Sequence, residues 1–284
     1  MSLLKCPVCN HVLTKKEKTF SCDLNHSYDI SKYGYTNLLL ANQIHSASPG
    51  DSAEMIKARV RFLNLNYYHI LRQKLVDTLK KYSLHMEENL NFCDLACGEG
   101  YYTNYIHQNL QNDKKVISYG VDLSKQAIIE ACKKQRREHL TNIHYVIGNL
   151  MNLPFLNDSF HLMLNCFAPM FDGEFLRILK EDGIYIRVLP GENHLYELKK
   201  VLYEHVEKNI LKETSIDGFE LLELIKVDDI ITLKTNQEIL DLFMMTPYFY
   251  KSPKETSQML CSMNALTTQI SFNILVYKKI RKDN

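Results

Sequence analysis

Three cysteines and one histidine near the start of the chain have the spacing of a zinc site. Two residues separate Cys6 from Cys9, three separate Cys22 from His26, and twelve lie between the two pairs. Two ligands from each of two tight turns can close a tetrahedron around Zn²⁺, and thiolate and imidazole are ligands that this metal prefers. Because the protein then fills all four positions, we predict a structural rather than a catalytic zinc site.

His11 is a competing ligand, but it stands where the first of the two turns should lead away from the metal. The plainer alternative is a set of buried cysteines with an incidental histidine, and the double spacing argues against it. A segment this short cannot bury enough apolar surface to fold alone. Bound metal would supply the missing stability.

A second group of residues has the pattern of a nucleotide-type cofactor site. In "CDLACGEGYYT" a predicted strand ends at Asp94, and a glycine turn follows at Gly98 and Gly100. Glycines let the backbone approach a ligand closely. The next predicted strand ends at Asp122, where a carboxylate can accept hydrogen bonds from ribose hydroxyls.

Two cofactors compete for this turn. A dinucleotide needs a third small residue, and this chain has Thr103 at that position. Counting from the acid gives Asp94-x-Ala96-x-Gly98-x-Gly100, which is the pattern of S-adenosylmethionine (SAM) methyltransferases with alanine in place of the usual first glycine. SAM has no pyrophosphate, so it does not require the third glycine. We therefore predict SAM as the cofactor.

The segment "GNLMNLPFLNDSF", which follows the third predicted strand, supports the choice of SAM together with Asp122. We include Asn149 from this segment among the predicted cofactor contacts, with Asp94, Gly98 and Asp122. The plainer interpretation of the segment is a loop and a buried strand, which it also is.

The elements that would position these groups alternate between strand and helix from about residue 91. Predicted strands cover "NFCDLAC", "KVISYGVD", "NIHYVIG", "FHLMLNCFA" and "GIYIRVL", and predicted helices cover "YYTNYIHQNL", "SKQAIIEACKKQ" and "HLYELKKVLYEHV". This alternation predicts an α/β fold with a parallel, doubly wound sheet. The chain from about Leu221 onward reads as further strands and helices.

The segment before this alternation carries a helical pattern. Apolar residues recur at helical spacing through residues 55–82, after a loop "HSASPGDSAEM" in which Asp51 is a plausible N-cap and Glu54 completes a capping box. We therefore divide the chain into a zinc-binding module (1–37), a linker with a helical segment (38–90) and a catalytic domain (91–284).

Composition narrows the class of protein. The chain has 284 residues, 45% of them hydrophobic, and eight cysteines, of which three lie in the first 22 residues. No apolar run approaches the ~20 residues needed to span a bilayer, and no apolar signal core opens the chain. A secreted disulfide framework would have denser, more even cysteines. We expect a cytoplasmic globular protein without a membrane partner.

The net charge of +1 hides an asymmetry. Residues 1–90 carry 12 Lys and Arg against 8 Asp and Glu, a net of +4, and the remainder carries 22 against 25, a net of −3. A net positive N-terminal part is compatible with a polyanionic partner, although an ordinary distribution of surface charges explains it equally well. The cations in the helical segment (Lys57, Arg59, Arg61, Arg72 and Lys74) are our candidates for contacting such a partner.

The order of motifs resembles the RlmA-type 23S rRNA (guanine-N1)-methyltransferases along nearly the whole chain. The resemblance rests on the zinc spacing and on "YGYTNLL", "PGDSAEM", "DLACGEGYYT", "GVDLSKQAI", "LPFLNDS", "APM", "LPGENHLYELK" and "MTPYFY". It implies a Rossmann-like SAM-dependent methyltransferase domain with a small N-terminal zinc-binding module that recognises RNA. The chain departs from the family at Ala96 and after the Ala-Pro pair in "FAPMFDGEF".

The resemblance also implies particular roles. The family's zinc ligands match Cys6, Cys9, Cys22 and His26, and its SAM contacts match Tyr68, Gly98, Glu99 and His194. It implies methylation of N1 of a guanine in hairpin 35 of 23S ribosomal RNA, and a homodimer in which two zinc modules could form one RNA cleft. The motif sequences favour the form of the family found in Gram-negative bacteria, but the sequence does not say which of two neighbouring guanines is modified.

Three other classes compete with this reading. A methyltransferase that acts on another RNA or on a small molecule would have the same cofactor-binding pattern, but an enzyme for a small molecule needs no zinc module. Thr103 argues against a dinucleotide enzyme. The complete cofactor pattern from Asp94 to Gly100 argues against an RNA binder that has lost catalysis. For the proton on guanine N1 we consider Asn165, Asp172 and Glu174 without assigning a base, and Phe167, Phe171 and Tyr248 could stack on the target base.

Overall fold

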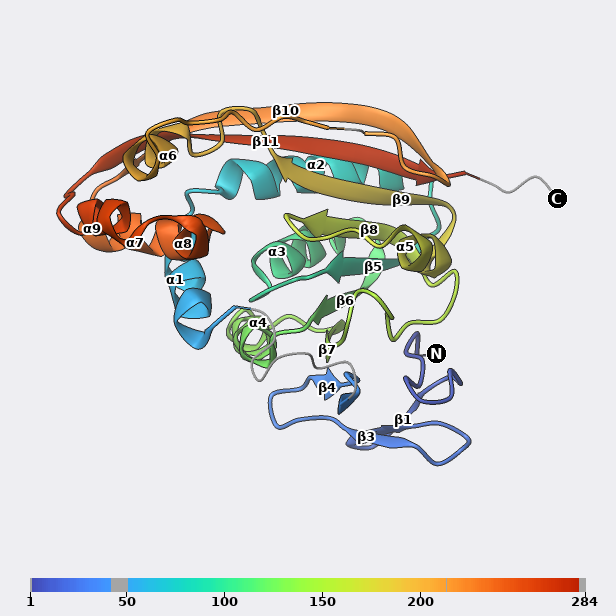
Figure 1. Ribbon diagram of the computed structural model, residues 1–284. Coiled ribbons are helices and arrows are strands. Elements are labelled where there is room, and N and C mark those ends of the chain that lie inside the picture. The colour runs from blue at the N-terminus through green and yellow to red at the C-terminus, as the bar shows by residue number, and fades with distance from the viewer. Residues whose placement is uncertain (1, 42–50, 213, 281–284) are drawn as a thin grey trace.

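The computed structural model describes residues 2–41, 51–212 and 214–280, and an eight-stranded sheet dominates it (Figure 1). The strand order is β10-β11-β9-β8-β5-β6-β7-β4. Strands β4 to β9 run parallel, and β11 is antiparallel to both β9 and β10. The bounds are β4 (Thr36–Asn37), β5 (Asn89–Leu95), β6 (Lys115–Asp122), β7 (Ile143–Ile147), β8 (Phe160–Cys166), β9 (Leu179–Pro190), β10 (Phe219–Leu233) and β11 (Leu266–Lys279).

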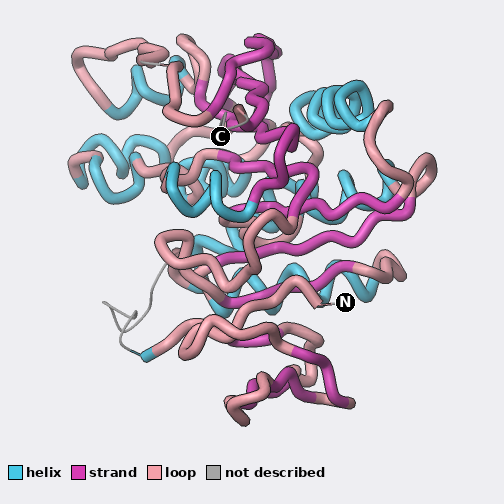
Figure 2. The backbone as a smooth tube through the Cα atoms, turned by 90° about the vertical axis from the view of Figure 1, so that its right-hand side faces the viewer, coloured by secondary structure: helices cyan, strands magenta, loops and turns pink. Residues whose placement is uncertain are grey.

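Helices and the N-terminal segment surround this sheet (Figure 2). The helices are α1 (Ala53–Asn64), α2 (His69–Ser83), α3 (Tyr101–Leu110), α4 (Lys125–Arg137), α5 (Asp172–Ile178), α6 (Tyr196–Leu202), α7 (Asn236–Met244), α8 (Tyr248–Lys251) and α9 (Lys254–Cys261). Three short strands, β1 (Thr14–Lys16), β2 (Thr19–Ser21) and β3 (Ser27–Asp29), form a separate antiparallel sheet beside β4. Among the described helices, none is long and apolar enough to cross a bilayer.

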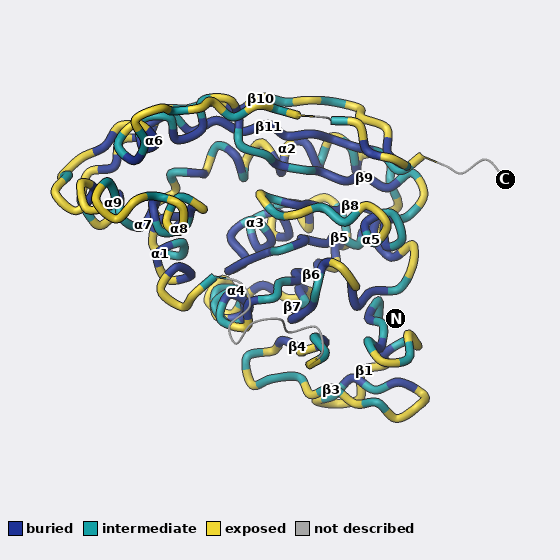
Figure 3. Tube along the Cα trace, viewed as in Figure 1, coloured by how far each residue is buried: buried dark blue, intermediate teal, exposed yellow. Residues whose placement is uncertain are grey.

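The central strands of the large sheet are largely buried (Figure 3), and their apolar side chains belong to two clusters, one on each face. In β9, Ile184, Ile186 and Val188 join the core formed with α2, α3 and α7, whereas Tyr185 joins the core on the opposite face. Burial on both faces explains why the consecutive residues Leu162, Met163 and Leu164 of β8 are all apolar. The α/β fold with a parallel, Rossmann-like sheet is confirmed.

The N-terminal segment takes the place of a helix on the second face. Leu4, Leu13 and Phe20 belong to the same apolar cluster as sheet residues, and Lys5 donates its N–H to the Pro154 carbonyl at 2.9 Å. The segment then joins the large sheet through β4, where Leu38 N–H donates to the Ile147 carbonyl at 2.9 Å. The division at residues 37 and 90 stays a prediction, and these contacts cross it.

Two local predictions were wrong. The helical segment 55–82 is two helices, α1 and α2, separated by a turn in which Asn66 adopts φ of +62°, a conformation that asparagine tolerates. The cap of α1 is Ser52, not Asp51, because the Ser52 hydroxyl accepts the Met55 N–H. The first part of the predicted loop, through residue 50, lies outside the described residues.

Candidate functional site

The four predicted zinc ligands converge. Their ligand atoms all lie within 4.8 Å of one another. The Sγ atoms of Cys9 and Cys22 are 3.6 Å apart, and the Nδ1 atom of His26 lies 3.4 Å from Sγ of Cys22 and 3.6 Å from Sγ of Cys6. A tetrahedron with Zn–S bonds of ~2.3 Å has ligand separations of about 3.8 Å, so the donor set fits Zn²⁺ in size and chemistry.

Backbone turns hold these ligands in place. Asn10 N–H donates to the Cys6 carbonyl at 2.9 Å, and Asn25 N–H donates to the Cys22 carbonyl at 3.1 Å. Both asparagines have φ above +60°. His11 lies apart from the cluster and is paired with Asp23 at 2.6 Å.

The glycine turn lies between the end of β5 and the start of α3. Gly98 has φ of +56°, and the nearest atom to a Cβ built there is Nη1 of Arg59 at 3.9 Å, so the turn leaves room for a ligand. Gly100 has φ of +78°, and a Cβ there would lie 2.5 Å from the hydroxyl of Tyr145. The two glycines therefore serve different purposes. Gly98 leaves space for a ligand, and Gly100 lets α3 pack closely against Tyr145.

Ala96 occupies the position of the family's usual first glycine and keeps that residue's conformation. Its φ is +59°, in the left-handed region that costs a non-glycine residue ~1–2 kcal/mol. The alanine at this position therefore adds backbone strain beside the site.

Thr103, the residue that argued against a dinucleotide, has a structural role. Its hydroxyl donates to Oδ2 of Asp94, and both side chains are buried. Burial raises the pKa of Asp94 to about 7, an effect that the Thr103 hydrogen bond opposes and the neighbouring Glu99 and Asp122 reinforce. Burial also raises the pKa of both Glu99 and Asp122.

These three carboxyl groups make the floor acidic. Burial and nearby carboxylates disfavour the ionised form of these groups, so a cationic ligand, which favours that form, is stabilised there and an anionic ligand is repelled. SAM, with a sulfonium and an ammonium group against one carboxylate, fits this floor. A dinucleotide, with its doubly charged pyrophosphate, does not.

Asp122 is at the end of β6, as predicted, but its carboxylate already organises the backbone. Oδ2 accepts the Gly98 N–H at 2.9 Å, and Oδ1 accepts the Ser124 N–H at 2.8 Å. Each oxygen keeps a further lone pair for a ribose hydroxyl. Asn149 follows β7 in the adjacent turn, where its Oδ1 accepts the Met151 N–H at 2.9 Å and Gly148 N–H donates to the Asp122 carbonyl at 3.1 Å.

Tyr68 and His194 form a second group at the other side of Tyr102. The hydroxyl of Tyr68 lies 3.4 Å from Nε2 of His194, and both side chains are buried against Phe272. The Ser271 N–H donates to Nδ1 of His194 at 3.2 Å, so the neutral ring carries its proton on Nε2. Burial, with nearby Lys199, lowers the pKa of His194 to about 3. The structure thus brings the seven predicted cofactor residues into two groups, and no contact joins Tyr68 or His194 directly to Asp122.

Phe167 lies over the second group in a strained conformation. Its φ is +58°, and its ring is stacked on His194 with centroids 6.1 Å apart and an interplanar angle of 26°. The side chain is nevertheless 43% exposed. Left-handed backbone at a bulky residue is uncommon and concentrates at functional sites.

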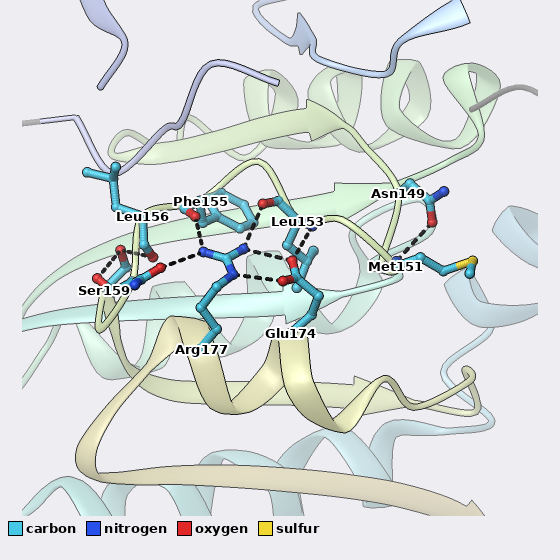
Figure 4. A network of polar contacts seen from close by, with 9 residues as sticks. Asn149, Met151, Leu153, Phe155, Leu156, Ser159, Glu174 and Arg177 are labelled. Carbon is cyan, nitrogen blue, oxygen red and sulfur yellow. Dashed lines mark hydrogen bonds and ion pairs between the residues drawn. The ribbon is translucent and has the colours of Figure 1, made fainter. Parts of the chain in front are cut away.

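The structure limits the candidates for a base. Glu174 is bound by Arg177 through two contacts of 2.7 Å and accepts the Leu153 N–H at 2.6 Å (Figure 4). Hydrogen bonds from Arg177 and Leu153 outweigh burial and lower the pKa of Glu174. Arg177 also contacts the carbonyls of Leu153 and Phe155, so this pair fixes the loop after β7. Glu174 is therefore a structural residue.

Two of the cations that we expected to contact RNA, Arg61 and Arg72, are engaged in contacts within the protein. Arg61 makes a two-point ion pair with buried Asp241, and Arg72 lies over the rings of Tyr101 and Tyr105, with its guanidinium carbon 4.9 and 4.3 Å from the centroids. Arg61 thus joins α1 to α7, and Arg72 packs α2 against α3. They are poor candidates for phosphate contacts.

Arg59 is a site residue that we missed among these cations. It pairs with Asp51 and faces the glycine turn, and its positive charge lowers the pKa of Glu99 and Asp122 against the larger effect of burial. It is the nearest cation to Gly98 within the described chain. The sequence offered no signal, because the helical spacing of Arg59 does not differ from that of its neighbours.

The fold and site define a methyltransferase, and the comparisons agree. Residues 4–47 match the family "RlmA, N-terminal" and residues 92–183 match "Methyltransferase domain". The Bacillus subtilis protein YxjB, provisionally named a 23S rRNA (guanine-N1)-methyltransferase, is 26% identical over 98% of each chain. The 23S rRNA (guanine(748)-N1)-methyltransferase of Streptomyces fradiae is 27% identical over 70% of this chain and 67% of its own.

The solved YcgJ protein of Bacillus subtilis shares the fold, with a TM-score of 0.50 and 15% identity over 73% of this chain and 98% of its own. The chain thus contains a methyltransferase domain with a Rossmann-like fold. More particularly, it combines that domain with an RlmA-type zinc ribbon, so the resemblance to RlmA-type enzymes is confirmed.

Proposed function

We propose that this protein transfers a methyl group from SAM to N1 of a guanine in hairpin 35 of 23S ribosomal RNA. The observation that carries the proposal is that an RlmA-type zinc ribbon shares one apolar core with an acidic cofactor floor. Relatives named as 23S rRNA (guanine-N1)-methyltransferases support the substrate. Methylation of another RNA or of a small molecule is the alternative, and relatives named demethylmenaquinone methyltransferase match over only 36–40% of this chain.

SAM would supply an electrophilic methyl group on its sulfonium centre. Asp122 and Asn149 would hold the adenosine end at β6 and β7, and the floor with Gly98 and Glu99 would hold the centre. Tyr68 and His194 would border the methionine end and the acceptor. Fixing donor and acceptor in line contributes several kcal/mol to such a displacement.

The target base must be unpaired when it reacts, because N1 of guanine lies in the Watson–Crick pair. A loop base or a flipped base satisfies this condition. The exposed face of Phe167, set against neutral His194, would stack on the base beside the methyl group. Since Glu174 is bound to Arg177, the proton on N1 must leave to another acceptor or to water.

The zinc ribbon offers a phosphate-binding surface of its own. Lys15, Lys16 and Lys18 are exposed along the β1–β2 hairpin. We propose that these lysines, rather than Arg61 and Arg72, contact the RNA backbone.

The decisive test incubates the full-length protein with tritiated SAM and deproteinised 23S ribosomal RNA, followed by nucleoside analysis. We expect 1-methylguanosine within hairpin 35. A different methylated nucleoside, or label in a small-molecule fraction instead of RNA, would favour the alternative. In calorimetry, Asp122→Ala should weaken SAM roughly ten-fold or more, because hydrogen bonds to charged groups contribute ~1.5–3 kcal/mol each, and NADH should not bind.

A matched pair of variants tests the RNA surface. Replacing Lys15, Lys16 and Lys18 by alanine should weaken RNA binding and flatten its salt dependence, because each lost phosphate contact releases one counterion fewer. SAM affinity should not change. Replacing Lys226 and Lys234, which are exposed in and just after β10 at the opposite end of the sheet from β4, is the control, and an equal loss from both sets would refute the assignment.

A further inference from the structure

The short helix α8 carries two exposed aromatic side chains that adjoin each other. Phe249 and Tyr250 are 38% and 68% exposed, and their rings meet edge to face with centroids 5.3 Å apart. We call this pair the α8 platform. Single exposed apolar side chains are normal on a protein surface, whereas adjoining ones mark an interaction surface.

Contacts on the inner side hold both rings of the α8 platform in place. Helix α8 lies beside α7 and next to α1 (Figure 1). Phe249 packs on Phe243 of α7 with centroids 5.5 Å apart, and the Tyr250 hydroxyl donates to Sδ of Met55 in α1 at 2.8 Å. Because the rings are already fixed in position, a ligand that binds them loses little free energy in ordering side chains.

The α8 platform adjoins the group that would receive the target base. Tyr248, the first residue of α8, is half-buried and packs against the apolar cluster that contains Tyr68. Burial, and after it the nearby Tyr248, raises the pKa of the Tyr68 hydroxyl. Tyr68 in turn contacts His194, on which Phe167 is stacked. The exposed ring of Phe167 and the α8 platform are therefore two exposed parts of one aromatic group.

The charges beside the α8 platform indicate the class of ligand. Residues 246–260 contain two lysines, Lys251 and Lys254, and one acid, Glu255, a net charge of +1. Both lysines are exposed, and neither forms an ion pair with another residue that the structure describes. Exposed aromatic faces beside unpaired cations are the features that bind single-stranded nucleic acid.

We propose that an unpaired nucleotide next to the target guanine stacks on the α8 platform while the guanine itself stacks on Phe167. This inference rests on the proposed function, because it takes the same RNA as the ligand. When the guanine leaves its stack, the neighbouring base loses a stacking partner, and the exposed ring of Tyr250 replaces that partner. The α8 platform therefore favours a guanine in a loop, where neighbouring bases are free, over one inside a continuous helix.

A matched set of full-length variants tests the role of the ring. Tyr250→Ala should raise the KM for a 23S rRNA hairpin containing the target guanine about ten-fold, because a base–aromatic stack is lost. SAM affinity should not change. Tyr250→Phe keeps the ring but loses the hydroxyl contact with Met55, and it should behave like the wild type. The control is Leu84→Ala, because Leu84 is also 68% exposed but lies at the end of α2 away from Tyr68.

Tryptophan fluorescence reports the stacking directly, because the chain has no tryptophan of its own. In Tyr250→Trp, saturation with the hairpin should quench the emission as a base stacks on the indole. A hairpin in which abasic sites replace the two nucleotides flanking the guanine should lose this quenching. Leu84→Trp should respond to neither RNA. Far-UV circular dichroism checks that each variant is folded.

The outcomes separate this inference from the proposed function. If the wild type forms 1-methylguanosine in the hairpin and Tyr250→Ala keeps the same KM, the α8 platform is refuted alone. A Tyr250→Phe variant as impaired as Tyr250→Ala assigns the effect to the contact between α8 and α1, not to stacking. Equal quenching by the normal and the abasic hairpin also overturns the proposal. A wild type that does not methylate the hairpin refutes the proposed function, and this inference with it.

Discussion

Gly98 and Gly100 lie in one turn with different surroundings, so a methyl group added at each should separate cofactor binding from folding. Both have positive φ, +56° and +78°. The Cβ of Gly98→Ala would meet Arg59 only at 3.9 Å, whereas that of Gly100→Ala would lie 2.5 Å from the Tyr145 hydroxyl and 3.1 Å from Cβ of Ala131. We predict that Gly98→Ala loses SAM affinity and Gly100→Ala loses stability.

The magnitudes follow from these contacts. Left-handed backbone costs an alanine ~1–2 kcal/mol, and the reduced freedom of the unfolded chain offsets ~0.4–1 kcal/mol at either position. Gly98→Ala should therefore lower the free energy of unfolding by about 1 kcal/mol. Gly100→Ala adds overpacking, typically ~1–3 kcal/mol. It also displaces Tyr145, whose hydroxyl donates to Asn104 at 2.6 Å, so the expected loss is about 2–5 kcal/mol.

The assay is urea unfolding followed by far-UV circular dichroism, because the chain has no tryptophan to report on tertiary structure. Calorimetric titration with SAM is run on the same preparations. Gly98→Ala should bind SAM at least ten-fold more weakly while remaining folded, because its methyl group projects into the space above the turn. Equal destabilisation by the two substitutions, or unchanged SAM affinity in Gly98→Ala, would refute the reasoning.

Ala96→Gly relieves left-handed strain and should change the free energy of unfolding by about 0–1 kcal/mol in the stabilising direction, measured by urea unfolding. Asp241→Asn removes one charge from the ion pair between buried Asp241 and half-exposed Arg61, and we expect a loss of ~1.5–3 kcal/mol in the same assay. The pKa of His194 is about 3 in the folded protein and about 6.5 in the unfolded chain. Between these two pH values the unfolded chain therefore binds a proton on His194 that the folded protein does not. The contribution of His194 to stability should therefore rise with pH across this window, while Asp94, whose pKa is raised to about 7, contributes in the opposite direction. The difference in the free energy of unfolding between the wild type and His194→Gln should accordingly grow as the pH rises. Purified protein should contain about one zinc per chain by mass spectrometry, and Cys22→Ser should lose it; full occupancy in that variant would contradict the ligand assignment.

The sequence by itself determined the ligands and the class of fold. Metal ligands near the N-terminus lie in short turns, so the spacing of Cys6, Cys9, Cys22 and His26 specified the site without long-range information. The alternation of strand and helix patterns likewise specified a parallel sheet, and the ends of its strands placed Asp94 and Asp122 at one edge. These features are local or follow from chain direction.

Only the tertiary structure decided which charged groups are free. Arg59, Arg61 and Arg72 share one helical pattern, but one faces the glycine turn, one pairs with Asp241 from a segment 180 residues away, and one packs between tyrosines. Glu174 looked available for proton transfer until Arg177 was found to bind it. The partner of a charge is set by packing between elements distant in sequence, and no local pattern encodes that choice.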